Sequence, residues 1–273
     1  MLLTRDAATI DRYELKYLIP MSYVEPISDF IAPYCELDKY SLSTDNHFYT
    51  VNSLYLDTRG NEFLKQRLWG KASRFNMRAR AYGDATSPPY FLEVKRKTGA
   101  GVKKFRATLN QSEWPGILTN DGSFTDESNN AIDKNKDLFL RLAASYAIEP
   151  KILTQYKRRA FFSVVNEYAR VTLDIDLKYQ LESKFNLIPG KQMTHYDNEV
   201  IYTKGESNGS CVILELKCPI GQVPVWMIDL IQYFELKQEG FSKYMNSSLT
   251  SMFDDGFQYM NPDRATPQNL FYS

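Results

Sequence analysis

YFLEVKRK, residues Tyr90 to Lys97, is the stretch of sequence that decides the fold. Successive side chains of a β-strand point to opposite faces, so Glu93 and Lys95 fall on one side of this segment and Leu92 on the other. A single segment of this kind is typical of a half-buried strand whose charges lie in water. The choice between that interpretation and a charged interior depends on whether the pattern is repeated.

The pattern is repeated in segments that are far apart in the chain. Glu-x-Lys occurs again at 14–16 and 215–217 between aliphatic or aromatic residues, whereas a copy at 235–237 lies in a helical pattern and is attributed to chance. The glycines in 98–101 predict a turn that joins two strands into a hairpin. Residues of high β-propensity predict strands at about 11–19, 50–57, 75–82, 90–97, 102–109, 152–165, 168–178 and 211–218.

Amphipathic segments between these strands predict helices. Apolar residues at helical spacing place them at about 22–34, after Thr58, at 134–147, at 225–236 and at 242–252. Weaker patterns predict a surface loop at 120–130, an irregular strand near 200–203 and a C-terminal tail at 254–273. We therefore expect one domain over residues 1–273, with its core at about 10–253.

Composition and charge limit the class of protein. The 273 residues are 43% hydrophobic and 14% aromatic, enough to bury a substantial core. Thirty-three basic and thirty-three acidic residues give a formal charge of zero, which argues against a nucleic-acid-binding protein with a basic exterior. Three cysteines without paired metal-ligand spacing, and no signal region, lead us to expect a cytoplasmic protein. No apolar run is long enough to span a bilayer, so a membrane partner, if there is one, is a separate protein.

The charged faces of the predicted strands carry an excess of basic residues. With one residue from the last helix, twelve basic side chains stand against five acidic ones. The basic residues are Arg12, Lys16, Arg78, Arg80, Lys95, Lys97, Lys104, Arg106, Arg158, Arg170, Lys217 and Lys243, and the acidic residues are Glu14, Glu93, Asp174, Asp176 and Glu215.

These faces are too many and too similar to belong to independent strands in water, and the apolar faces need the helices to cover them. We therefore predict an α+β fold, a closed antiparallel β-barrel flanked by helices, with the charged faces turned inward to form a tunnel. An interior of Arg and Lys is tolerated only when it is filled by water and a polyanion. Arg offers bidentate contacts and Lys point charges, so the tunnel favours phosphates.

The few carboxylates on the charged faces are consistent with a metal ion that is bound together with the phosphate polyanion. Magnesium and manganese bind through one or two carboxylates plus substrate phosphates, so Glu215, helped by Glu14 or Glu93, is a candidate metal ligand. The alternative is that these carboxylates neutralise lysines on neighbouring strands, and for Glu93 both interpretations remain open. Replacing Arg80 or Arg158 by Ala is expected to reduce phosphate binding without loss of stability, because a like charge leaves a crowded tunnel.

Eight short motifs occur in the order seen in a known family. They are RYELKY at 12–17, SLYLD at 53–57, RARAY at 78–82, LEVK at 92–95, YKR at 156–158, RVTLD at 170–174, LELK at 214–217 and FSKY at 241–244. In this ordered set the chain resembles the VTC domain, the polyphosphate polymerase domain of the vacuolar transporter chaperone complex and a member of the triphosphate tunnel metalloenzymes. The resemblance spans about residues 10–250.

The resemblance implies a tunnel that binds ATP and inorganic polyphosphate or triphosphate with Mn²⁺ or Mg²⁺, and that transfers the terminal phosphate of ATP to a growing polyphosphate chain. By position it makes Lys16, Arg78, Arg80, Lys95, Arg158 and Lys243 phosphate ligands and Glu215 the metal ligand. We assign catalysis to Arg78, Arg80, Lys95, Arg158 and Lys243. We assign substrate binding to Arg12, Lys16, Lys97, Lys104, Arg106, Arg170 and Lys217, and the metal to Glu215, Glu14 and Glu93.

Two other functions stay open. The segment R-x-E-x-K at 12–16 lacks the first Glu of the E-x-E-x-K motif of adenylate cyclase and thiamine triphosphatase relatives, which leaves a triphosphatase or polyphosphatase as an alternative. A non-catalytic sensor of polyphosphate or inositol phosphate is the third, although anion binding alone needs no carboxylate such as Glu215. The inositol-phosphate-sensing domain and membrane helices of the eukaryotic complex have no counterpart in this sequence, so coupling of synthesis to translocation is not implied.

Overall fold

The structure is a computed structural model, and it describes residues 12–83, 85–99, 101–119, 133–166, 168–196 and 211–254. The predicted loop at 120–130, the irregular strand near 200–203 and the tail beyond residue 254 lie outside the described residues. Within them, the predicted strands and helices are present with small shifts of their ends.

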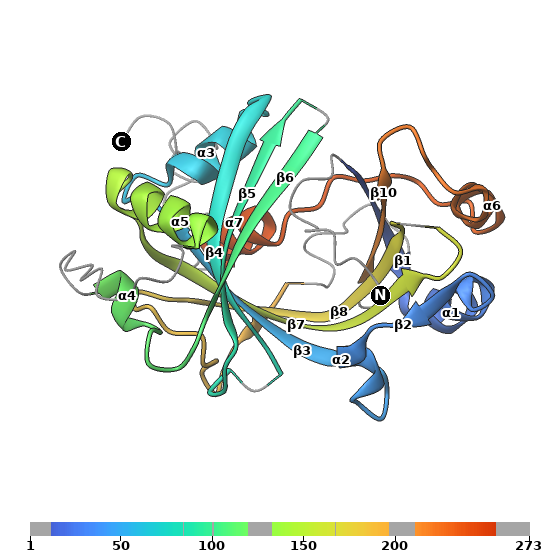
Figure 1. Cartoon of the computed structure of the whole chain (residues 1–273), viewed down its shortest axis with the longest axis horizontal. Helices are drawn as coiled ribbons and strands as arrows, with labels where there is room; N and C mark the ends of the chain where they lie inside the picture. Colours follow the sequence, from blue (N-terminus) through green and yellow to red (C-terminus); the bar gives the residue numbers. More distant parts are fainter. Residues whose placement is uncertain are drawn as a thin grey trace.

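The described strands form one antiparallel sheet, as predicted. Its order is β1-β10-β8-β7-β3-β4-β5-β6, with the short β2 beside β7 and β9 beside β8 (Figure 1). The strands are β1 (Arg12–Pro20), β2 (Cys35–Leu37), β3 (Tyr49–Asp57), β4 (Ser73–Tyr82), β5 (Tyr90–Thr98), β6 (Gly101–Leu109), β7 (Glu149–Ser163), β8 (Arg170–Leu181), β9 (Thr194–His195) and β10 (Cys211–Pro219).

The helices flank the sheet. They are α1 (Val24–Ile31), α2 (Lys39–Leu42), α3 (Glu62–Leu68), α4 (Gly116–Thr119), α5 (Lys134–Ser145), α6 (Val225–Tyr233) and α7 (Lys243–Asp254), and a 3-10 turn at Met21–Tyr23 precedes α1. Among the described residues, no helix has the length and apolar character needed to cross a membrane.

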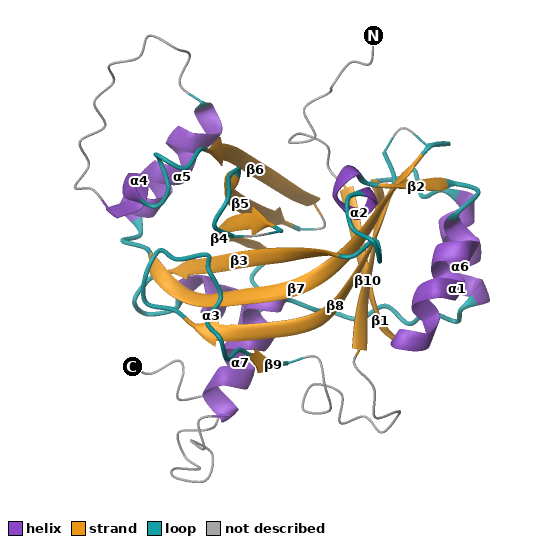
Figure 2. Cartoon of the chain, turned by 90° about the horizontal axis from the view of Figure 1, so that it is seen from below, coloured by secondary structure: helices purple, strands orange, loops and turns teal. Residues whose placement is uncertain are grey.

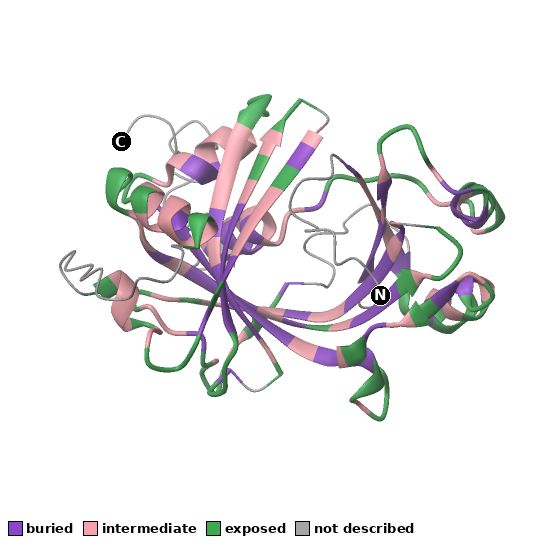
Figure 3. Cartoon of the chain, in the orientation of Figure 1, coloured by how far each residue is buried: buried purple, intermediate pink, exposed green. Residues whose placement is uncertain are grey.

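The helices cover the apolar faces of the strands, as the alternation predicts. Helices α1 and α6, side by side in Figures 1 and 2, bury Ile27 and Met227 in one cluster with Leu214 of β10. Helix α5 buries Phe139 in a second cluster with Leu92 of β5. In Figure 3 the buried positions concentrate on the strands and the exposed ones on the outer sides of the helices. The covered faces therefore leave the charged faces on the inner side of the sheet.

The sheet curls until its two end strands, β1 and β6, approach each other (Figure 1). No backbone ladder joins these two strands in the part of the chain that the structure describes. A side-chain contact nevertheless links β1 to this side of the sheet, because Lys95 of β5, the neighbour of β6, forms an ion pair with Glu14 of β1. The inner face thus surrounds a charged interior, as expected for the predicted barrel.

One residue predicted on the inner face lies elsewhere. The register between β7 and β8 shifts between Gln155 and Lys157, and Asp176 has a φ of 54°. A bulge of this kind re-aims a side chain, and the Asp176 carboxylate lies 3.0 Å from Lys178 Nζ and 3.8 Å from Lys157 Nζ. The prediction for Asp176 is wrong because regular alternation assumes an unbroken strand.

Candidate functional site

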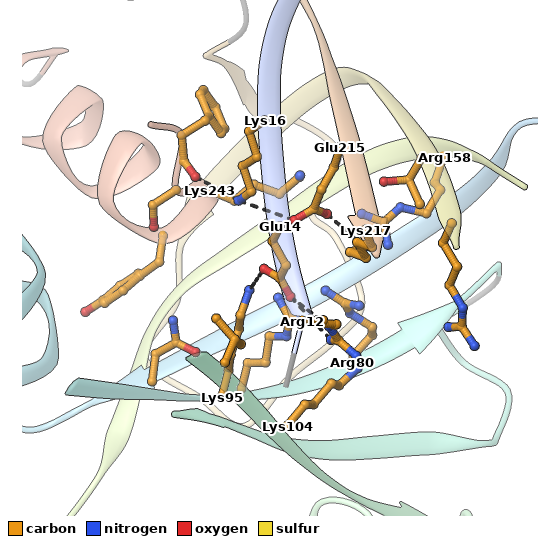
Figure 4. A pocket seen from close by; sticks show the side chains of 18 of the residues that line it. Arg12, Glu14, Lys16, Arg80, Lys95, Lys104, Arg158, Glu215, Lys217 and Lys243 are labelled. Atoms are coloured by element: carbon orange, nitrogen blue, oxygen red, sulfur yellow. Dashed lines mark hydrogen bonds and ion pairs between the residues drawn. The ribbon is translucent and has the colours of Figure 1, made fainter. Parts of the chain in front are cut away.

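The inner face of the sheet lines a cavity of about 950 Å³, part of which is shown in Figure 4. Its wall carries fourteen basic side chains and four acidic ones. The basic residues are Arg12, Lys16, Arg67, Arg74, Arg78, Arg80, Lys95, Lys97, Lys104, Arg106, Arg158, Arg170, Lys217 and Lys243, and the acidic residues are Glu14, Asp38, Glu215 and Glu239.

All twelve basic residues chosen from the sequence line this one cavity, so the predicted convergence of the charged faces is confirmed. Of the three predicted metal ligands, Glu14 and Glu215 also line it. The third, Glu93, lies behind the wall and pairs with cations that form it. The catalytic, substrate-binding and metal-binding roles of these residues remain predictions.

Two basic lining residues, Arg67 of α3 and Arg74 of β4, escaped the sequence analysis. The predicted strand began at residue 75, although extending its alternation by one residue places Arg74 on the same face as Arg78. No comparable signal marked Arg67, because the helical pattern does not say which side of α3 meets the cavity.

The carboxylate of Glu93 is enclosed by four basic side chains, and we call this group the Glu93 cage. Glu93 Oε2 accepts from Arg78 Nε at 2.8 Å and lies 3.8 Å from Arg80 Nη1. Glu93 Oε1 accepts from Arg106 Nε at 2.7 Å and lies 2.6 Å from Lys104 Nζ. Arg78 and Arg106 stand directly opposite Glu93 on the two adjoining strands, so the sheet register builds the cage.

The cage keeps Glu93 ionised. Burial raises the pKa of this carboxyl, which is 1% exposed, but Lys104 and the three arginines hold the pKa well below its ordinary value. Because both oxygens already have cationic partners, the geometry favours charge neutralisation over metal binding for Glu93.

Tyrosine hydroxyls of the cavity wall also contact arginines of the cage. Arg80 Nη2 donates to Tyr156 Oη at 3.2 Å, and Arg106 Nη2 donates to Tyr82 Oη at 2.9 Å. These contacts restrict the guanidinium groups before any ligand arrives, and their planar forks suit bidentate contact with phosphate oxygens.

A second buried carboxylate, Asp174 of β8, binds two cations of the wall. Arg158, directly opposite on β7, contacts both oxygens, with Nε at 2.6 Å from Oδ1 and Nη2 at 2.7 Å from Oδ2. Lys243, at the start of α7, places Nζ 2.5 Å from Oδ2. Burial raises the pKa of Asp174, which is 1% exposed, but Arg158 and Lys243 hold it below its ordinary value.

The third acidic feature is the pair Glu14 and Glu215, on neighbouring strands β1 and β10. The register sets Glu14 opposite Lys217 and Lys16 opposite Glu215, so the two carboxylates stand diagonally on the inner face (Figure 4). Lys217 Nζ lies 2.9 Å and Lys16 Nζ 3.8 Å from Glu215, while Glu14 pairs with Lys95. Burial and the nearby Glu215 raise the pKa of Glu14, but Lys95 and Lys217 bring it down to about 2.

The lysines of the wall carry the opposite perturbation. Burial lowers the pKa of Lys217 to about 8 even though Glu215 favours its charged form. Burial likewise lowers the pKa of Lys16 and Lys243, and that of Lys104 well below its ordinary value. A bound polyanion restores the charged form of such lysines, because it supplies the negative charge that their surroundings lack.

Helix α7 is fixed by a residue that never reaches the cavity. Asp57, fully buried at the end of β3, accepts from the backbone N–H groups of Phe63 and Leu64 at 2.9 Å each, where α3 begins. The same carboxylate accepts from Tyr244 Oη at 2.7 Å. Since Tyr244 follows Lys243 in the chain, this contact holds the first turn of α7 where Lys243 can reach Asp174.

The acidic residues of the wall suit a divalent cation only in part. Among the described residues, no group of three or more His, Cys, Asp or Glu side chains could hold a metal ion by itself. Glu14 and Glu215 offer hard oxygen donors on one face, and each now binds lysine. Magnesium and manganese take one or two carboxylates together with substrate phosphates, so this pair fits such an ion when a phosphate chain is present.

Solved structures of other proteins resemble this chain at low sequence identity. A putative adenylate cyclase from Bacillus halodurans has 15% identity over 85% of this chain and 95% of its own, with a TM-score of 0.44. A putative adenylate cyclase from Vibrio parahaemolyticus has 12% identity over 88% and 98%, with a TM-score of 0.45. The putative adenylyl cyclase HpAC1 from Hippeastrum, described as revealing a dominant triphosphatase activity, has 15% identity over 90% and 96%, with a TM-score of 0.49.

Family membership rests on the sequence of the chain itself. No protein with a curated description matches it. The model of the VTC domain matches residues 11–252, which includes every described strand and nearly all of α7. This match confirms the resemblance seen in the eight ordered motifs, and the chain belongs to the VTC domain family.

Proposed function

We propose that this protein is a metal-dependent polyphosphate polymerase that transfers the terminal phosphate of ATP to a polyphosphate chain inside the cavity. One observation carries the proposal, namely the inner wall with fourteen basic side chains against four acidic ones in a chain of zero formal charge. A wall of this kind concentrates a polyanion. The family resemblance supplies the reaction.

The arrangement suits phosphoryl transfer without a protein nucleophile. In such transfer the protein acts mainly by positioning the phosphates and by stabilising the charge on the transferred group. Arg78, Arg80 and Arg158 are restrained by carboxylates and tyrosines, so they meet the phosphates with little reorganisation. Lys95 and Lys243 add point charges on the same wall.

Glu14 and Glu215 are the residues that would hold a Mn²⁺ or Mg²⁺ ion. When bound, the ion neutralises phosphate charge and favours in-line displacement. Glu215 also orients Lys16 and Lys217, so the same carboxylate sets the position of two lysines beside the metal site.

Product length tests the proposal. Purified protein is incubated with ATP and manganese or magnesium, and the products are resolved by chain length. Long chains support the polymerase, orthophosphate alone identifies a hydrolase of triphosphate or polyphosphate, and unchanged ATP identifies a non-catalytic binder. The variant Arg96→Ala serves as a control for the loss of a basic side chain outside the cavity. Arg96 is an exposed arginine of β5 on the face away from the cavity.

A further inference from the structure

Three basic side chains of the cavity wall form no ion pair with a carboxylate among the described residues, and we call them the Arg74 group. They are Arg67 of α3, Arg74 of β4 and Lys97 of β5, and all three line the cavity. Arg74 and Lys97 stand directly opposite each other in the β4–β5 ladder. Burial and the like charges of Arg74 and Arg67 lower the pKa of Lys97, and burial and the charge of Arg74 lower the pKa of Arg67.

The Arg74 group has no acidic partner among the described residues. Arg74 donates to the backbone carbonyl of Lys71, and no carboxylate of the described ranges pairs with Arg67, Arg74 or Lys97. Glu239 lines the same cavity but is exposed and forms no ion pair in the described part of the chain. Burial lowers the pKa of Arg67 and of Arg74, whereas Arg78 and Arg106 of the Glu93 cage have raised values.

Like charges directly opposite in a sheet destabilise it. The β5–β6 ladder has a comparable pair, Arg96 and Lys103, but both of these are exposed on the outer face, where water screens them. Arg74 and Lys97 are half-buried and face the cavity, where screening is weaker and a third cation is added. An arrangement that is unfavourable in the empty protein is explained if an anion completes it.

The position of the group along the strands defines the shape of that anion. Lys97 lies two residues beyond Lys95, and Arg74 lies four residues before Arg78, on the same inner faces. At about 3.3 Å per residue these steps correspond to roughly 7 and 13 Å. An anion that occupies the centre of the cavity must therefore be long and linear to reach the Arg74 group as well.

We propose that Arg67, Arg74 and Lys97 form a separate subsite for the phosphates of a linear polyphosphate that extends beyond the Glu93 cage, so that the cavity prefers long chains to triphosphate. The subsite rests on the proposed function only in taking a phosphate chain as the ligand. It gives Arg67 and Arg74, to which the sequence assigned no site role, a part in discriminating phosphate chains by length.

Metal-free titration calorimetry with tripolyphosphate and with long-chain polyphosphate tests the subsite. The test variant is Arg74→Ala/Lys97→Ala, and the matched control is Arg96→Ala/Lys103→Ala, which removes the same charges from the outer face of the neighbouring ladder. A second test variant, Arg67→Ala, has its change on a helix and leaves both ladders intact. Thermal unfolding of the unliganded test variants should show unchanged or higher stability, because repulsion has been removed.

We expect the test double variant to bind long-chain polyphosphate at least tenfold more weakly, about 1.4 kcal/mol, and tripolyphosphate within twofold of wild type. The control should bind both ligands within twofold of wild type. Equal losses for both ligands, or no loss for either, would overturn the subsite. Length-dependent binding by a protein that makes no polymer from ATP would support the subsite and reject the polymerase, and a wild type that binds neither ligand would reject both.

Discussion

The Glu93 cage and the Arg74 group share one cavity wall but differ in how their charges are balanced. In the cage, four cations surround a carboxylate that is 1% exposed. In the Arg74 group, three cations face each other without an acidic partner in the described residues. The comparison separates two uses of basic residues: those of the cage also stabilise the sheet through Glu93, whereas those of the Arg74 group are proposed to act on a ligand alone.

Glu93→Gln is the strongest test of this difference. Removing the buried central charge leaves four cations in mutual repulsion, and breaking a buried ion pair from one side typically costs about 3–5 kcal/mol. We expect the melting temperature of the unliganded protein to fall by about 10 °C. Tripolyphosphate should raise the melting temperature of the variant by more than it raises that of wild type, because the anion replaces the lost charge.

A loss of under about 1 kcal/mol for Glu93→Gln would contradict the structural role of the cage. Turnover at saturating substrate gives an independent check. If the folded variant loses turnover while it still binds phosphate, Glu93 acts on the metal ion, as one of the two sequence interpretations held.

Arg158→Ala extends the comparison to Asp174. The sequence alone predicted no loss of stability, since a like charge leaves the tunnel. The bidentate contact reverses this expectation, because Asp174 would keep only Lys243. We expect a loss of about 3 kcal/mol in the free energy of unfolding, measured by chemical denaturation.

The double variant Arg158→Ala/Asp174→Asn is the control for that loss. It should recover part of the stability, since no uncompensated carboxylate remains. If Arg158→Ala is as stable as wild type, Arg158 acts on the ligand alone, as proposed for the Arg74 group.

Glu215→Gln tests a carboxylate that belongs to neither group. Loss of a metal ligand should reduce metal-dependent turnover by about 100-fold or more, while metal-free tripolyphosphate binding stays equal or becomes tighter, because Lys16 and Lys217 are released. Glu239→Gln is the matched control, since Glu239 lines the cavity but is exposed. A tenfold weaker metal-free affinity in Glu215→Gln would show that Glu215 mainly orients the lysines.

The smallest expected effect is a pH dependence. The pKa of Lys217 is about 8 in the folded protein against an ordinary value of 10.5, so between these values the unfolded chain binds more protons. The free energy of unfolding therefore gains from Lys217 as the pH rises through this window, by up to about 1.4 kcal/mol per pH unit. Comparing wild type with Lys217→Met from pH 7 to pH 9 isolates this contribution, and a constant difference would refute it.

The sequence was most informative where strands are regular. Alternation in β1, β4, β5 and β6 placed Glu14, Lys95 and Lys104 on the inner face without any structural information, and the hairpin turn at 98–101 fixed which strands are neighbours. It failed at Asp176, because one bulge reverses the faces of the residues that follow and alternation carries no signal for it.

The pairing of side chains from distant segments could not be predicted from the sequence. Arg158 and Asp174 belong to motifs that were both recognised, yet only the β7–β8 register brings them into bidentate contact. The sequence prediction for the stability of Arg158→Ala used net charge alone, because it could not identify Asp174 as the partner of Arg158. For the same reason, the role of Arg67 depends on how α3 is placed against β4, which no local pattern encodes.

Asp57 has a consequence for the entropy of binding. By holding both the start of α3 and Tyr244 of α7, this one buried carboxylate fixes the backbones that carry Arg67 and Lys243, far apart in sequence. Preorganised groups lose less conformational freedom when a ligand arrives. A phosphate chain that contacts both side chains would therefore meet a scaffold whose ordering took place during folding, and more of the electrostatic attraction would remain as affinity.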